Sequence, residues 1–154
     1  MKNATVFASL NMMHKAMLLG QVIFTAVMFF LVYKKMLEPV AAKHEKILQL
    51  IAIFFAAIVI LLGNNLFKRK LALINQHSSL SSKSKLEMYR SAMFLYWGLA
   101  EAGSLVSGIC LLLSGNYAFL ALGAVLIVYF AMLIPVKTRI AAQLNLQTEE
   151  LDKL

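Results

Sequence analysis

The sequence predicts an all-α polytopic membrane protein: a single domain, residues 1–154, with four transmembrane helices arranged as two hairpins. The first observation is composition, because 61% of the residues are hydrophobic and only 14% are charged. In soluble globular domains roughly 45–50% of the residues are hydrophobic and about 25% are charged. The second is that the apolar residues form four runs of 18 to 23 residues: 16–33, 47–67, 91–113 and 118–136. A transmembrane helix needs about 20 such residues, and it satisfies its own backbone hydrogen bonds in lipid.

The first run follows a segment whose apolar residues already recur at helical spacing. These residues are Val6, Phe7, Leu10, Met13 and Met17. This pattern is typical of an amphipathic helix lying along a membrane interface. We therefore expect an N-terminal interfacial helix before the first span.

Lys and Arg are distributed unevenly between the connections. The first 15 residues, the 68–90 loop and the C-terminal tail carry 11 of the 15 basic residues, whereas the 34–46 link carries four and the 114–117 turn none. Basic residues favour the cytoplasmic side, so we expect both termini and the 68–90 loop in the cytoplasm. The short outer turn predicts a tight hairpin between the third and fourth spans, and the Ser-rich stretch 78–84 a flexible hinge.

The net charge of +8 also has its explanation in this distribution. The basic residues flank the apolar runs, where they set topology and contact anionic lipid heads. We therefore expect the lipid bilayer, further copies of the chain or other membrane subunits as partners, and not nucleic acid.

Glu101 is the one charged residue inside the four runs. It lies 11 residues after Arg90, which at 1.5 Å per residue is about 16 Å along a helix and near the middle of a bilayer core. Intramembrane carboxylates face the protein interior or water, and they are functional candidates by default. The candidate partners at matching depth are Gln21, Thr25, Ser104 and Tyr129.

Three interpretations of Glu101 remain open. It could bind a proton or cation as water reaches it; it could be a protonated carboxyl that bonds helix to helix within the bundle; or it could meet a polar or basic group on another subunit. A transport path needs several polar groups, and the second and fourth spans offer few of them.

Small residues recur along the third span in two rows. These are Ala100, Ser104 and Gly108, and Gly103 with Ser107. Small residues at this spacing let helix backbones approach closely. The third span should therefore be the helix with the most protein contact, with partners from its own chain or from another.

The sequence contains no pattern that predicts catalysis, a cofactor or a metal. Its three histidines, His14, His44 and His77, fall in separate segments without the spacing of a metal site. A glycine-rich phosphate loop, a nucleophile elbow and paired carboxylates are all missing. Trp97, one turn before Glu101, is expected to fill space. We expect a protein that is not an enzyme.

Two short resemblances add to this reading. Gly98-Leu99-Ala100-Glu101-Ala102 resembles the ion-carrying helix of rotary ATPase proteolipid subunits, which pairs a mid-membrane carboxylate with small neighbours. Here, however, the carboxylate is on the first helix of its hairpin, and glycine-rich partner helices are missing, so that function is not carried over. The second half, from the Glu101 span through 114–117 to Leu144-Asn145-Leu146, resembles a type of small bacterial four-helix inner-membrane protein. That resemblance implies a bacterial plasma-membrane location and no particular activity.

The expected function is therefore that of a small non-catalytic subunit or scaffold of a membrane complex, packing through the third span with Glu101. The alternative is a component of a proton- or cation-coupled transporter or channel in which Glu101 is the ion-binding carboxyl.

Overall fold

The computed structural model describes residues 6–77 and 80–147, and this part of the chain is helical with no strand. Three of its helices, or four if a bent pair counts as one span, are long and apolar enough to cross a membrane. The elements are α1 (Val6–Tyr33), η1 (Ala42–His44), α2 (Glu45–Gln76), α3 (Ser82–Ser114), α4 (Ala118–Met132) and α5 (Lys137–Leu144).

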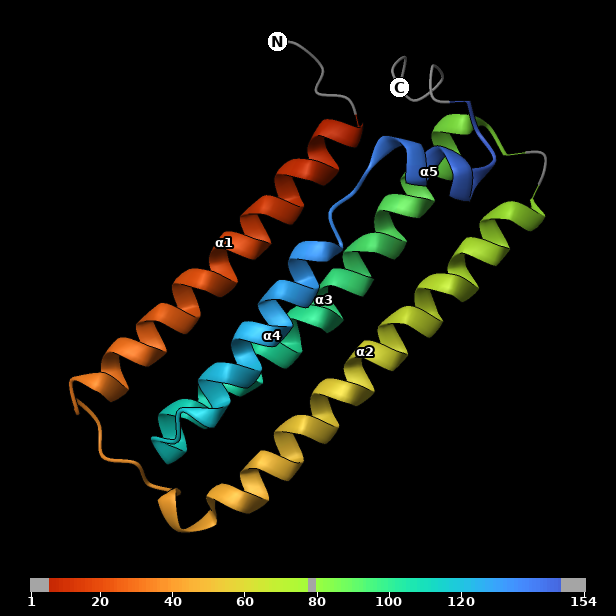
Figure 1. The fold of residues 1–154 in the computed structure, drawn as a ribbon. Coiled ribbons are helices and arrows are strands. Elements are labelled where there is room, and N and C mark those ends of the chain that lie inside the picture. Colours follow the sequence, from red (N-terminus) through yellow and green to blue (C-terminus); the bar gives the residue numbers. More distant parts are fainter. Residues whose placement is uncertain (1–5, 78–79, 148–154) are drawn as a thin grey trace.

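Helix α3 is the centre of the fold (Figure 1). It packs against α1, α2 and α4, running parallel to α1 and antiparallel to the other two. In its most apolar stretch of 18 residues half of the positions are buried, compared with 11% in α1 and 22% in α2. The expectation that the third span has the most protein contact is thus confirmed.

The first two spans were expected to form a hairpin, but α1 and α2 do not pack on each other. They lie against different faces of α3, as the separation of the two ribbons in Figure 1 shows. The link between them crosses the end of α3, where the Ala41 amide donates a hydrogen bond to the Leu113 carbonyl at 2.9 Å. The small side chains of α3 explain this arrangement, since they leave room for three neighbours around one helix.

The N-terminal segment is not a separate interfacial helix, which corrects that expectation. It is the first part of α1, and its residues Leu10 and His14 are buried in the bundle. An amphipathic stripe of this kind suits a protein core as well as a membrane surface, and here the apolar side of the segment covers α3 and the end of α4.

The expected 68–90 loop is also mostly helical. Helix α2 continues to Gln76 and α3 begins at Ser82, so the connection is confined to 77–81. Ile74, Leu86 and Tyr89 are buried in the core and extend the apolar faces of both helices past the charged residues. The Ser81 side chain caps α3 by accepting from the Ser84 amide at 3.2 Å. Of the expected hinge, residues 78 and 79 lie outside the described residues.

Helix α4 ends at Met132, four residues before the end of the predicted span. Pro135 explains the break, because proline lacks an amide donor and disfavours helix at the residue before it. The chain then turns by 69° into α5, which lies across the end of the bundle (Figure 1). With 15 residues, α4 is about 22 Å long, shorter than a bilayer core of about 30 Å.

Candidate functional site between α1 and α3

Parallel packing of α1 and α3 joins two of the predicted site residues. The Ser104 hydroxyl lies 3.0 Å from Oε1 of Gln21, and both side chains are buried. The hydroxyl also lies 2.9 Å from the Glu101 backbone carbonyl. Gln21 and Ser104 are 83 positions apart in the sequence, and so are His14 and Trp97, whose rings are in contact. The same offset places Glu101 level with Leu18 on α1.

Glu101 itself is half-buried and lies at the edge of the α1–α3 contact. In the part of the chain that the structure describes, its carboxylate has no hydrogen-bond or ion-pair partner. Gly98, one turn earlier on the same face, is exposed, and a Cβ added there would meet no atom within 4 Å. The carboxylate therefore faces a surface that the chain leaves open.

Glu101 lies about two turns of α3 beyond a cleft between α1 and α3, and it does not line that cleft. A cleft of about 360 Å³ lies between Met13 on α1 and Phe94 and Arg90 on α3. Residues seven apart lie on nearly the same side of a helix. Gly20 and Glu101 follow Met13 and Phe94 by seven residues, so each lies on the same side of its helix as the cleft. We call this open line between α1 and α3 the α1–α3 seam.

The other two predicted partners do not join Glu101. Thr25 is buried on α1, and its hydroxyl has no partner among the described residues. Tyr129 instead pairs with Tyr96, with 2.7 Å between the hydroxyl oxygens. Tyr96 precedes Glu101 by five residues, which is about 140° around a helix, so this pair lies on the other side of α3.

The small residues of α3 are used within the chain. A Cβ on Gly103 would lie 3.4 Å from Leu126 and 3.6 Å from Val59, so α4 and α2 both approach there. The Ser107 hydroxyl donates to the Phe119 carbonyl at 2.6 Å. Ala100 is buried in the same core, and Gly108 faces Phe24 of α1. This row is therefore an internal packing surface and not one left free for another chain.

His14 is the site residue that the sequence reasoning missed. Its Nε2 lies 3.0 Å from the Phe130 carbonyl, and the two rings stack with centroids 4.9 Å apart. Because a carbonyl only accepts, Nε2 carries the hydrogen and donates it. The signal was present in the spacing of His14, Gln21 and Thr25 at seven and four residues, which places all three on one face of α1.

Four buried polar atoms on that face have no partner among the described residues. They are Oδ1 of Asn11, Nδ1 of His14, Nε2 of Gln21 and Oγ1 of Thr25. Buried polar groups in folded proteins are nearly always satisfied by protein or by ordered water. All four come from α1, so this helix carries hydrogen-bond donors and acceptors that have no protein partner in the described part of the chain.

Trp97 fills the space beside this polar line. It is fully buried, its ring centroid is 5.1 Å from that of His14, and its Nε1 donates to the Leu133 carbonyl at 3.3 Å. The bond satisfies a carbonyl at the broken end of α4. These contacts are those of a side chain that packs the junction of α1, α3 and α4.

Comparison of the chain with protein-family models, with curated proteins and with solved structures finds no match. No group of three or more His, Cys, Asp and Glu suited to a metal occurs among residues 6–77 and 80–147. The fold and this site define an all-helical protein whose apolar helices are compatible with a membrane, with an unpartnered carboxylate on its central helix.

Proposed function

We propose that this chain is a non-catalytic integral membrane protein that binds a membrane-spanning helix of another protein along the α1–α3 seam. The observation that supports the proposal is Glu101: a carboxylate on the central helix, at the depth of the apolar core, without a partner in the described chain. An ionisable group at such a depth needs a partner or water. A donor side chain on a docking helix supplies one.

The surroundings of Glu101 fit a helix. Gly98 on α3 and Gly20 on α1 are both exposed, and a Cβ at either position would meet no atom within 4 Å. Glycines at a surface let a second backbone approach closely in a membrane. The outer side of α1 is apolar and exposed as well, at Leu19, Ile23 and Val27. The seam therefore offers a partner helix an apolar surface, two glycines where backbones can approach closely, and one carboxylate for a hydrogen bond.

The chemistry favours another protein over a second copy. The partner needs a hydrogen-bond donor or a cation in its apolar stretch. A second copy could not supply a cation, because the apolar runs of this chain contain no Lys, Arg or His. A second copy would place one carboxylate opposite another, which is unfavourable unless one is protonated.

Two variants of Glu101 test the proposal. Glu101→Leu should reduce recovery of the partner about tenfold, because an interhelical hydrogen bond in a membrane contributes about 1–2 kcal/mol. Glu101→Gln should keep most of it, since the amide retains shape and hydrogen bonding. The measurement is native mass spectrometry of the tagged chain, solubilised gently from its own membranes, with identification of the co-purified peptides.

Glu38→Leu is the matched control, because Glu38 is exposed in the α1–α2 link away from the seam. It should leave recovery unchanged. Circular dichroism should show the same helix content for all three variants. Recovery of an equal amount of partner with Glu101→Leu and Glu38→Leu would contradict the proposal, and a particle built from this chain alone would replace it with self-association.

A second candidate function is favoured by the four unpartnered polar atoms of α1. A row of ordered waters there would connect the buried His14 and Gln21 with the half-buried Glu101, as a path for protons requires. Under this alternative Glu101→Gln leaves the particle intact but abolishes a pH-dependent flux into proteoliposomes. Under the docking proposal the same variant changes no flux, so one reconstitution separates the two.

A further inference from the structure

A second site lies on the opposite side of α3, where α2 and α4 barely touch. A cleft of about 370 Å³ opens between α2 and the break that separates α4 from α5. Beyond the cleft, toward the turn between α3 and α4, Val59 of α2 and Leu126 of α4 both approach Gly103 of α3. The cleft, called the slot below, lies at the end of the bundle that carries α5, and it is separate from the α1–α3 seam.

Most residues that line the slot are apolar or aromatic, and Asn64 and Gln143 are its uncharged polar members. Phe67 stacks on Tyr96 with centroids 5.5 Å apart and meets Tyr89 edge-on at 5.6 Å. Met93, Leu133 and Pro135 complete this part of the wall. Such a surface suits a hydrocarbon chain.

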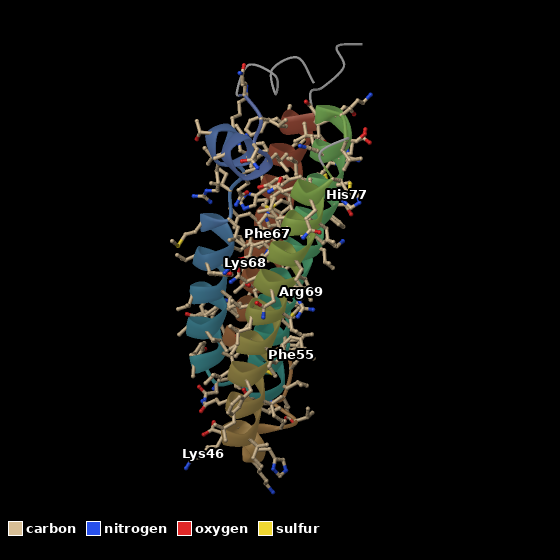
Figure 2. All side chains as sticks on the ribbon, turned by 90° about the vertical axis from the view of Figure 1, so that its right-hand side faces the viewer. Lys46, Phe55, Phe67, Lys68, Arg69 and His77 are labelled. Atoms are coloured by element: carbon tan, nitrogen blue, oxygen red, sulfur yellow. The ribbon has the colours of Figure 1, made fainter. Side chains whose placement is uncertain are left out.

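The mouth of the slot is cationic. Lys68 of α2 and Arg139 of α5 both line it, and neither forms an ion pair in the described part of the chain. Figure 2 looks onto α2 and shows Phe67 and Lys68 on the side next to α4 and α5, with Arg69 on the other side. Helix α5 begins at the mouth without a side-chain cap, so its positive end adds to the same field.

Lys68 and Arg139 both lie just beyond the end of an apolar run. Lys68 is the first charged residue after the second apolar run, and Arg139 follows the end of the fourth. An apolar slot that ends in positive charge at this level matches a molecule with a hydrocarbon chain and an anionic head at the membrane surface.

The position of α5 is fixed by bonds across the cleft end. The Tyr89 hydroxyl donates to Oε1 of Gln143 at 2.8 Å, and Nδ2 of Asn75 donates to the Gln143 carbonyl at 2.9 Å. The helix that carries Arg139 is therefore tied to both α2 and α3, which holds the two cations on opposite walls of one opening.

We propose that this slot binds one anionic phospholipid, with its phosphate between Lys68 and Arg139 and an acyl chain against Phe67 and Met93. The two cations favour an anionic headgroup. The apolar lining favours a molecule with a hydrocarbon chain over a free anion. The proposal does not depend on the docking function of the α1–α3 seam.

The test is lipid retention by the purified protein in native mass spectrometry. The probes are phosphatidylglycerol and phosphatidylcholine with identical acyl chains, offered in equal amounts. The wild-type chain should retain one phosphatidylglycerol in preference. A cation near an anionic membrane surface contributes about fivefold in binding, so Lys68→Gln with Arg139→Gln should reduce the preference about 30-fold.

The matched control is Arg69→Gln with Lys70→Gln, which removes the same charge at the same depth outside the slot. It should keep the preference for phosphatidylglycerol. An equal loss in both double variants would overturn the site, since the effect would then follow net charge alone. Displacement of the lipid by equimolar inorganic phosphate would overturn the lipid in favour of a free anion.

Discussion

Replacing Trp97 by alanine is expected to lower the free energy of unfolding by about 3–5 kcal/mol. The side chain is fully buried among His14, Phe130 and the end of α4. Its removal leaves a cavity at the point where α1, α3 and α4 meet, and it deprives the Leu133 carbonyl of its donor. Unfolding in mixed detergent, followed by far-ultraviolet circular dichroism, measures the change.

Trp97→Phe separates the two contributions. Phenylalanine fills most of the space but cannot donate to Leu133, so its cost should be well below that of alanine. If Trp97→Ala unfolded within about 1 kcal/mol of the wild type, the cavity argument would fail. The junction around Trp97 would then not be the tightly packed centre described above.

Gly108→Leu is expected to lower the free energy of unfolding by about 1–3 kcal/mol. A Cβ at this position would lie 2.6 Å from Cε1 of Phe24 and 3.5 Å from Cγ of Met28. The larger side chain therefore pushes α1 away from α3, and it strains the Gln21–Ser104 bond one turn along. The same detergent unfolding assay measures the loss.

Gly98→Leu is the control for this change on the same helix. No atom lies within 4 Å of a Cβ at Gly98, and leucine favours helix over glycine. The fold should therefore be as stable as the wild type or more stable, whereas binding of a partner helix in the α1–α3 seam should weaken. Equal destabilisation by Gly98→Leu and Gly108→Leu would contradict the α1–α3 packing described here.

The extent of the helices was predictable only in part. Apolar runs locate the stretch of a helix suited to lipid, but a helix continues wherever one face still has a core to cover. Leu10 and His14 extend α1 at its start, and Ile74 and Leu86 extend α2 and α3 beyond the charged residues. An amphipathic segment that leaves an apolar run cannot show from sequence whether it covers protein or membrane surface.

The arrangement of the helices could be predicted only in part. The small residues of α3 correctly indicated the helix with most contact, because backbones approach closely only where side chains are small. They could not show that α1 would pack on α3 and not on α2. The early end of α4 was signalled by Pro135, whose effect on the preceding residues outweighs their apolar character.

The candidate site could also be predicted only in part. Depth along a helix follows from counting residues, and the side chains of Gln21 and Ser104, expected at similar depth, lie 3.0 Å apart. Direction around the helix does not follow when the neighbouring helix is unknown, which is why Tyr129 pairs with Tyr96 and not with Glu101. His14 was passed over because it precedes the first apolar run, although it shares a face with Gln21 and Thr25.

Site-specific photo-crosslinking in native membranes tests whether a helix of another protein lies in the α1–α3 seam. A benzophenone amino acid in place of Gly98 points into the open seam, where the structure leaves room for it. The same group in place of Val128, which is 61% exposed on α4, reports on the opposite surface. We expect one dominant protein adduct from position 98, lost when Glu101→Leu is added, and none from position 128. No adduct at position 98, or the same adducts from both positions, would contradict it.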